Sequence, residues 1–186
     1  GVLRNVLRRK NSDTQAPSAD NSIPTLAAEL SHPEWLVQRW LAEFGLSEAT
    51  ALMRANNERA PLVLRANRVK CNRDQLLTRL RDHGIAATPT PLSPQGIAIE
   101  SSGNVEKLPG FAEGLFQVQG ESSQLVAFLL APSAGERILD ACAAPGGKAT
   151  HIAELMEDSG TVVALDNSSR GLDRIRDNIT RLNLRS

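Results

Sequence analysis

Two short apolar runs near the end of the chain, joined by a glycine-containing loop and a helical pattern, constrain the fold more than any other feature. The first run is Ile138–Ala141, and it leads directly into the loop Cys142–Lys148, which reads CAAPGGK. Helical spacing of apolar residues follows, and a second run, Thr161–Leu165, ends on Asp166. Strand, helix and strand within about 30 residues predict a βαβ unit with parallel strands, and the first run, which lacks polar alternation, predicts a buried strand. We therefore expect an α/β domain.

The loop has the chemistry of an anion-binding turn. Gly146 and Gly147 allow backbone N–H groups to approach a ligand closely at the amino end of a helix, where negative charge is favoured. Asp166, at the end of the second strand, is placed to accept hydrogen bonds from ribose hydroxyl groups. Lys148 has two interpretations, a partner for the negatively charged end of the ligand or a solvated residue in the first helical turn. Together these residues predict a site for an adenosine-bearing cofactor.

Other nucleotide sites fit the loop less well. It lacks G-x-G-x-x-G, which weighs against an NAD-linked oxidoreductase, and it is not G-x-x-x-x-G-K-[ST], which excludes a P-loop. No metal-ligand spacing connects the three histidines with the two cysteines, so we expect no metal. His151, one turn after the loop, is interpreted as a helix-face residue rather than a catalytic base.

Before this unit, the sequence has the pattern of a small α+β domain. An amphipathic stripe from Val37 to Phe44 predicts a helix that begins near Pro33 and ends at Gly45, with a second helix after it. Asn72 and Gln75 have the spacing of a capping pair for a further helix, which Gly84 ends. Strands are predicted at residues 61–67, 97–100 and 115–119.

The charge is unevenly distributed although the formal net charge is zero. Residues 54–81 hold eight basic and two acidic side chains, whereas residues 100–169 hold ten acidic and three basic ones. A basic block is typical of phosphate contact with nucleic acid, and its alternative interpretation is a solvated helix face. The candidate RNA contacts are Arg65, Arg68, Lys70 and Arg73.

The composition limits the cellular compartment and the class of protein that this sequence is compatible with. No run of 18 apolar residues exists, so we expect no membrane-spanning helix, and the first residues do not form a signal peptide. The two cysteines fit a reducing cytoplasm better than a disulfide-stabilised secreted protein. Aromatic residues make up only 3 %, so the chain has few platforms for stacking on single-stranded bases.

The stretch Leu139–Lys148 resembles the cofactor loop of the RNA cytosine-C5 methyltransferases that use S-adenosylmethionine, and Val163–Asp166 is similar to their ribose-binding strand end. Upstream, Leu108–Phe111 and Phe116–Gln124 resemble the segment that precedes this loop in the family. Pro61–Arg73 resembles the small RNA-binding domain. Finally, Gly1–Arg9 is similar to the end of the NusB-like helical domain found in the bacterial 16S rRNA branch, the Sun/Fmu (RsmB) type.

This resemblance implies methylation of C5 of a cytosine in 16S rRNA, by a cytoplasmic protein that we expect to be a monomer. It implies that the cofactor lies across Cys142, Ala143, Ala144, Pro145, Gly146, Gly147 and Lys148, with its ribose on Asp166. In the family, a nucleophilic and an assisting cysteine lie in Asp-Ala-Pro-Cys and Thr-Cys-Ser loops. Neither motif occurs here, so no catalytic residue is assigned; Cys142 is given a packing role in the cofactor loop and Cys71 a structural or surface role.

The expected organisation follows from these matches. Residues 1–10 end a NusB-like domain, 11–32 form a linker, 33–110 form the α+β RNA-binding domain, and 111–186 begin a Rossmann-like methyltransferase domain, so we expect a piece of a longer protein. Two parallel strands alone leave apolar faces and a sheet edge open, which favours the same interpretation. The alternatives are a tRNA-directed enzyme, which the NusB-like match disfavours, and a non-catalytic RNA-binding module.

Overall fold

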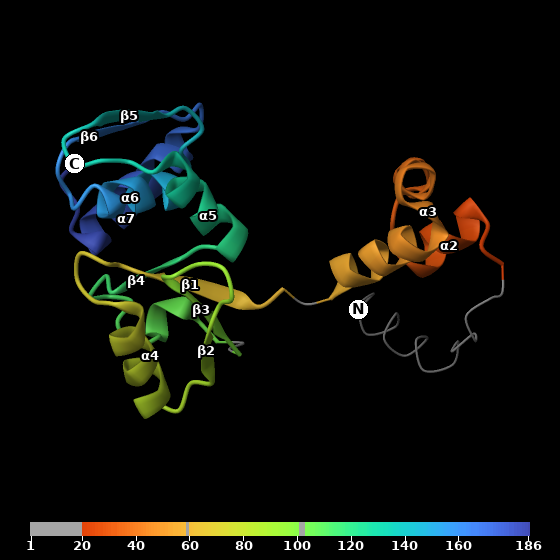
Figure 1. The fold of residues 1–186 in the computed structure, drawn as a ribbon, viewed down its shortest axis with the longest axis horizontal. Helices are drawn as coiled ribbons and strands as arrows, with labels where there is room; N and C mark the ends of the chain where they lie inside the picture. The colour runs from red at the N-terminus through yellow and green to blue at the C-terminus, as the bar shows by residue number, and fades with distance from the viewer. Residues whose placement is uncertain (1–19, 59, 101–102) are drawn as a thin grey trace. The chain divides into compact units, whose positions relative to one another are not determined.

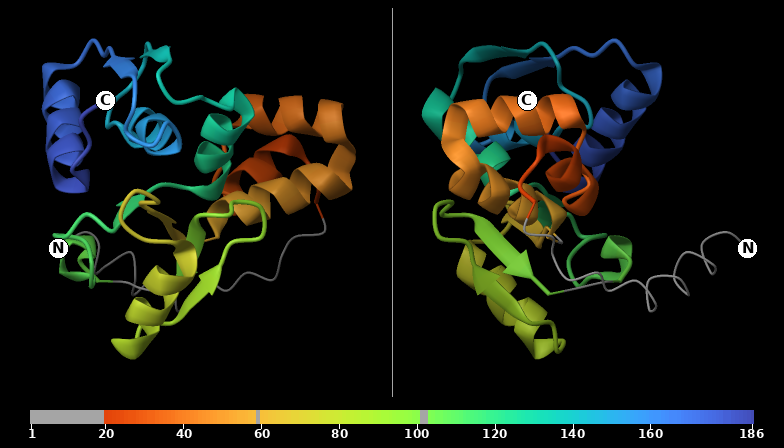
Figure 2. Two further views of the ribbon diagram at one scale, coloured as in Figure 1. Left: turned by 60° about the vertical axis from the view of Figure 1, so that its left-hand side comes forward. Right: turned by 90° about the vertical axis from the view of Figure 1, so that its right-hand side faces the viewer.

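The computed structural model describes residues 20–58, 60–100 and 103–186, and the chain divides into two compact units, residues 1–60 and 61–186 (Figures 1 and 2). The predicted end of a NusB-like domain at residues 1–10, and the predicted linker as far as residue 19, lie outside the described residues.

The described residues of the first unit include the helices α2 (Ile23–Glu29) and α3 (Glu34–Asn57). Gly45, with φ of +74°, interrupts α3, which confirms the prediction that one helix ends there and another follows. The predicted linker is wrong over α2, because Leu26 and Ala27 are buried against α3 and give this short segment a packed face. The core of this unit consists of Leu26, Ala27, Val37, Ala49 and Met53.

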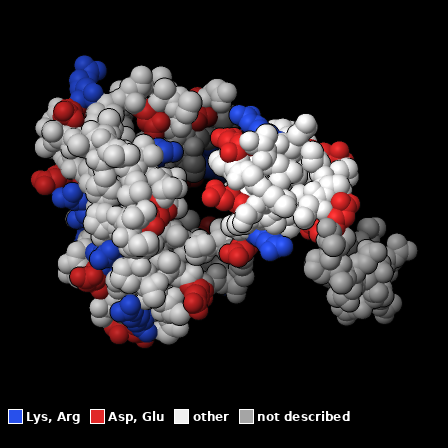
Figure 3. All heavy atoms as spheres, turned by 45° about the vertical axis from the view of Figure 1, so that its right-hand side comes forward, with Lys and Arg blue, Asp and Glu red and all other residues white. Residues whose placement is uncertain are grey.

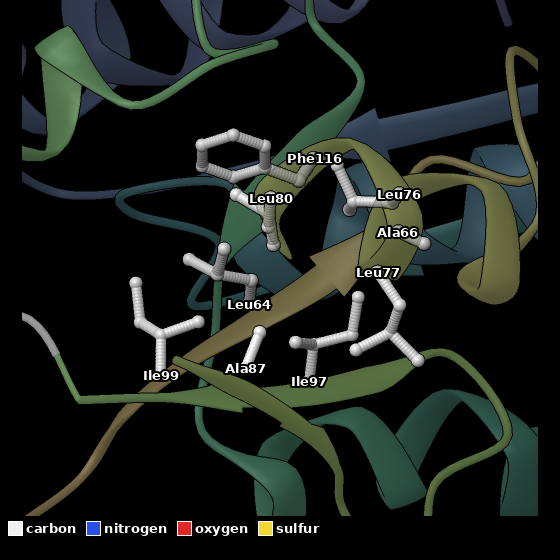
Figure 4. Close-up of a cluster of buried hydrophobic side chains, with 9 residues drawn as sticks. All are labelled: Leu64, Ala66, Leu76, Leu77, Leu80, Ala87, Ile97, Ile99 and Phe116. Atoms are coloured by element: carbon white, nitrogen blue, oxygen red, sulfur yellow. The ribbon is translucent and has the colours of Figure 1, made fainter. Parts of the chain in front are cut away.

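The second unit begins with a four-stranded antiparallel sheet in the order β2-β3-β1-β4. The strands are β1 (Leu62–Ala66), β2 (Ala87–Pro89), β3 (Gly96–Ile99) and β4 (Phe116–Val118). Helix α4 (Arg73–Asp82) covers one face, where Leu64 and Ile97 pack with Leu76 and Leu80 in the core of Figure 4. Strand β4 forms one edge of this sheet by pairing with the central strand β1. It therefore belongs to this sheet, although it follows the predicted domain boundary at residue 110.

Helix α4 begins as its sequence predicts. The side chain of Asn72 accepts a hydrogen bond from the Gln75 N–H (2.8 Å), and the side chain of Gln75 accepts one from the Asn72 N–H (2.9 Å). This reciprocal capping box satisfies two N–H groups that a helix start leaves unpaired. Gly84, with φ of +74°, follows the last turn. The local sequence therefore predicts both ends of this helix.

The remaining elements form the predicted βαβ unit with flanking helices. Strands β5 (Arg137–Asp140) and β6 (Thr161–Ala164) pair in parallel and are joined through α6 (Gly147–Leu155). Helices α5 (Glu121–Leu130) and α7 (Ser169–Leu182) lie with α6 on one face of this pair, and the short helix η1 spans Val105–Lys107 (Figure 1).

The prediction of a buried strand at Ile138–Ala141 is wrong for half of its side chains. Ile138 packs against α5 and α6, but Leu139 on the opposite face is 60 % exposed. Val163 of β6 is likewise 40 % exposed. Within the described residues, helices cover only one face of the β5–β6 pair, so exposure alternates along both strands.

Candidate functional site

The loop between β5 and α6 has a fixed backbone conformation. Gly146, the residue before the first turn of α6, has φ of +97°, a left-handed conformation that favours glycine. Its N–H donates to the carbonyl oxygen of Ala143 (2.6 Å), and the Ala143 N–H donates to the Leu165 carbonyl (2.9 Å). The Ala144–Pro145 peptide bond is cis. The loop is thereby tied to the end of β6 before any ligand is considered.

Asp166 secures the same loop from the other strand. Its Oδ2 accepts a hydrogen bond from the Ala144 N–H (2.9 Å), and its Oδ1 accepts one from the Ser168 N–H (3.0 Å). These N–H groups, chiefly that of Ala144, hold the pKa of the Asp166 carboxyl below its usual range, so the group is ionised. The Asn167 N–H contributes to the same lowering, so three backbone N–H groups surround a carboxylate that has about four acceptor positions, and one position remains for an additional donor.

An open pocket lies beside the loop. One wall is formed by Gln119 and Ser123, near the start of α5, and by their neighbours Val118 and Gly120. The other wall contains Cys142, Ala143, Ala144, Pro145, Gly147 and Lys148. The structure therefore brings six of the seven predicted loop residues together, whereas Gly146 faces Ile175 and Asp166 reaches the loop through Ala144.

Five residues that line the pocket were not predicted as site residues from the sequence: Val118, Gln119, Gly120, Ser123 and Asp140. Gln119 and Ser123 come from the segment before the βαβ unit, and only the three-dimensional fold places them opposite the loop. Asp140, at the carboxyl end of β5, also lines the pocket; its Oδ1 accepts the Cys142 N–H (3.3 Å). Its Oδ2 is buried and has no hydrogen-bond partner within the described residues. The sequence signal that could have identified Asp140 is a carboxylate at the carboxyl end of a strand that belongs to a parallel pair.

One of the four predicted RNA contacts is wrong. Arg65 is completely buried and forms an ion pair with Glu154 (2.6 Å), so it presents no surface to a phosphate group. Arg68 is partly exposed, 3.9 Å from Glu157. Lys70 Nζ donates to the carbonyl oxygens of Glu113 (2.7 Å) and Arg181 (3.3 Å).

Arg73, the fourth candidate, donates from Nη1 to the Ser93 carbonyl oxygen (3.3 Å), and its side chain is only partly exposed. Positive and negative side chains are interspersed over the face shown in Figure 3, so this face carries no broad basic area. The roles of Arg68, Lys70 and Arg73 in RNA binding stay predictions.

The other titratable candidates lie away from solvent or outside the pocket. His151 is fully buried, and its Nε2 lies 2.7 Å from Gln95 Oε1; burial lowers its pKa to about 2, so the ring is neutral. The Sγ of Cys71 lies 3.4 Å from the Leu115 carbonyl oxygen, and burial raises the thiol pKa. Across the described part of the chain, no three His, Cys, Asp or Glu side chains form a metal-binding group, and no helix has the length and apolar character needed to cross a membrane.

Two family models match this chain. Residues 32–106 match the ferredoxin-like domain of the RsmF/B-like methyltransferases, and residues 127–186 match the 16S rRNA methyltransferase RsmB/F model. Two curated relatives are both named ribosomal RNA small subunit methyltransferase B. Over 186 residues, the protein of Citrobacter koseri is 39 % identical and that of Salmonella paratyphi B is 41 % identical. Both comparisons cover 100 % of this chain and 42 % of the relative, so the chain spans less than half their length.

Solved structures have the same fold. A methyltransferase homologue from Pyrococcus horikoshii matches with a TM-score of 0.80 and 27 % identity, over 90 % of this chain and 55 % of its own. NSun6 from Pyrococcus horikoshii, determined with SFG, matches with a TM-score of 0.77 and 21 % identity, over 83 % of this chain and 64 % of its own. The second match supports the fold alone.

Proposed function

Because this chain belongs to the RsmB/F methyltransferase family, we propose that its loop pocket binds S-adenosylmethionine and that the protein methylates C5 of a cytosine in 16S rRNA. S-adenosylmethionine is the cofactor of this family, as the sequence resemblance implied. The names of the relatives favour rRNA over tRNA as the substrate. We further propose that β5–α6–β6 begins a Rossmann-like sheet, that residues 1–10 end a NusB-like domain, and that the protein acts in the cytoplasm.

The observation that supports this proposal best is the gathering of six loop residues around one pocket, with the ionised Asp166 tied to the same loop. Asp140 adds independent support, because its buried Oδ2 needs a hydrogen-bond donor that the described residues do not supply. An ammonium group of a bound amino-acid moiety is such a donor. The residues present therefore fit an adenosine cofactor that carries an amino acid.

The residues of the pocket have separate tasks in this proposal. Asp166 would use its remaining acceptor position for a ribose hydroxyl, and Asp140 would accept from the amino group. The exposed Lys148 would pair with the cofactor's carboxylate, and the N–H groups at the start of α6 would add positive potential there. When bound, S-adenosylmethionine supplies an activated methyl group. Cys142 lines this cofactor pocket, and we assign it packing rather than nucleophilic attack.

Calorimetric titration of the 186-residue chain with S-adenosylmethionine, and separately with NAD, tests the cofactor assignment. Binding of S-adenosylmethionine alone is expected, and preference for NAD would contradict the proposal. For the substrate, the product of the complete gene is incubated with methyl-labelled S-adenosylmethionine and with 16S rRNA or bulk tRNA. Label as 5-methylcytosine in 16S rRNA is expected. Label in tRNA alone would overturn the substrate, and cofactor binding without label would favour a non-catalytic module.

A further inference from the structure

The two faces of strand β1 have different chemistry. Leu64 and Ala66 point into the apolar core beneath α4. Arg65 and Asn67 alternate with them and are also completely buried, but they contact polar groups of the later helices. Strand β1 is therefore buried on both sides, and Arg65 and Asn67 join its second side to α6 and α7 by hydrogen bonds.

All five N–H groups of Arg65 have acceptors, which is the full donor capacity of a guanidinium group. Nε and Nη2 donate to the two carboxylate oxygens of Glu154, at 3.2 and 2.6 Å. Nη2 also donates to Thr150 Oγ1 (3.1 Å). Nη1 donates to the carbonyl oxygen of Gly147 (2.6 Å) and to Gln119 Oε1. The planar guanidinium group therefore fixes the directions in which its acceptors lie, in addition to supplying a positive charge.

Two of these acceptors belong to residues that line the loop pocket. Gly147 is the first residue of α6 and belongs to the loop wall, whereas Gln119 belongs to the wall before α5. A single nitrogen, Nη1 of Arg65, bonds to both. Arg65, which lies in the antiparallel sheet and does not itself line the pocket, therefore joins the two segments that line it.

We propose that Arg65 is a positioning residue for the cofactor pocket, which holds Gln119 and the first turn of α6 at the separation that S-adenosylmethionine requires. This inference rests on the proposed function. It makes the ferredoxin-like domain a part of the cofactor site through a contact within the protein. Glu154 and Thr150 keep the guanidinium in place from the same face of α6, since they follow Gly147 at helical spacing.

The chain offers a matched control in Asn67. It lies two residues further along the same face and is equally buried, and its Nδ2 donates to the carbonyl oxygens of Gly114 (3.0 Å) and Leu182 (3.1 Å). None of these groups lines the loop pocket. Loss of Asn67 therefore weakens the same interface without touching the pocket walls.

The test compares the parent chain with the double variant Arg65→Met/Glu154→Met and with Asn67→Ala. Replacing both partners of a buried ion pair by apolar residues of similar volume is often tolerated, so the double variant is expected to fold. Arg65→Lys, which keeps the charge but lacks the planar guanidinium group, is a second variant. Thermal unfolding reports stability, and calorimetry at a temperature where every variant is folded gives the Kd for S-adenosylmethionine.

We expect the Kd to rise at least tenfold in the double variant and severalfold in Arg65→Lys, with no change in Asn67→Ala despite a lower Tm. An unchanged Kd in the double variant would overturn the proposal. An equal rise in Asn67→Ala would also overturn it, because the effect would then follow general loosening of the interface.

Hydrogen exchange of the cofactor-free proteins separates this inference from the proposed function. The N–H groups of Ala144 and Thr150 are hydrogen-bonded at the two ends of the loop, to Asp166 and to the Gly146 carbonyl oxygen. Their exchange is expected to accelerate in the double variant but not in Asn67→Ala. If the parent does not bind S-adenosylmethionine, the cofactor assignment fails, while unchanged exchange in the double variant refutes the positioning role by itself.

Discussion

The carboxylate of Asp166 accepts a hydrogen bond from the backbone N–H of Ala144 at 2.9 Å, which connects the end of β6 to the loop that follows β5. The residue assigned to the ribose thus also shapes the loop that holds the rest of the cofactor. Because one carboxylate serves both purposes, its substitution should affect the ligand and the loop together.

We predict that Asp166→Ala weakens S-adenosylmethionine binding at least tenfold, because it removes the ribose acceptor and frees the Ala144 N–H. Asp166→Asn keeps one oxygen and should lose less. Calorimetry measures both constants. Since its backbone partners lower the Asp166 pKa, the carboxylate remains ionised above its usual pKa of 3.8, and affinity should not decline between pH 8 and pH 6 through this group. Unchanged affinity in the alanine variant would refute the ribose assignment.

The adjacent glycines Gly146 and Gly147 should respond in different ways to alanine. At Gly146 the left-handed φ of +97° disfavours any side chain, so Gly146→Ala is expected to cost roughly 1–3 kcal/mol of unfolding free energy. Gly147 is helical, and a Cβ there would lie 3.7 Å from Gln119, an ordinary contact. Gly147→Ala should therefore leave stability unchanged or higher but reduce cofactor affinity, because the added methyl group narrows the pocket. Urea unfolding and calorimetry on both variants distinguish these outcomes.

Lys148 is exposed at the rim of the pocket, so its contribution should be modest and sensitive to salt. Lys148→Ala is expected to raise the Kd for S-adenosylmethionine by about twofold to fivefold at low salt, consistent with the few tenths to one kcal/mol of an exposed charge pair. At high salt the parent and the variant should converge. Equal affinity at both salt concentrations would favour the interpretation of Lys148 as a solvated helix residue.

Arg68 is a predicted RNA contact whose side chain is partly exposed. If it contacts a phosphate, Arg68→Ala should weaken binding of a 16S rRNA transcript and reduce the slope of log K against log salt by about one. Arg176→Ala is a suitable control, because Arg176 is an exposed arginine that pairs locally with Asp173 on α7. Fluorescence anisotropy across a salt series measures the slopes. Identical slopes for the parent and Arg68→Ala would show that Arg68 does not contact a phosphate of the RNA.

His151 makes stability depend on pH. Its folded pKa is about 2 because of burial, whereas an exposed histidine has a pKa of 6.5, so the unfolded chain binds the proton first. The contribution of the neutral, buried His151 to the free energy of unfolding is fully present above pH 6.5. It should fall by up to about 1.4 kcal/mol for each pH unit below that value. Urea unfolding at pH 7.5 and 5.5 tests this, with His151→Gln as the comparison. A pH-dependent loss of the same size in both proteins would assign it to other groups.

The parts of the fold that depend on neighbouring residues were predictable from the sequence. The capping box at Asn72, the break at Gly45 and the βαβ unit each follow from local spacing, and the structure has all three. Strand β2 was not predicted, because three residues next to several prolines carry too little periodicity. Helix α2 was missed for a similar reason, since two buried residues make a weak pattern.

The error at Arg65 has a different physical origin. The prediction of RNA contact rested on the block of basic residues between positions 54 and 81, and a basic residue between apolar ones in a strand is normally on a solvated face. Its partner Glu154 is 89 residues away in the sequence, and nothing local announces a carboxylate buried in the second turn of a helix. Gln119 and Ser123 were missed for the same reason, because pockets join segments that only the tertiary fold brings together.

The buried Arg65–Glu154 pair also limits how the sequence can diverge. A lone change at either position leaves an uncompensated charge in a closed interface, which is far more costly than changing both. We therefore expect positions 65 and 154 to covary among relatives, so that acceptable sequences carry either both charges or neither. Evolution of the antiparallel sheet and of the helix beside the pocket is coupled at this point, although the two elements match separate family models.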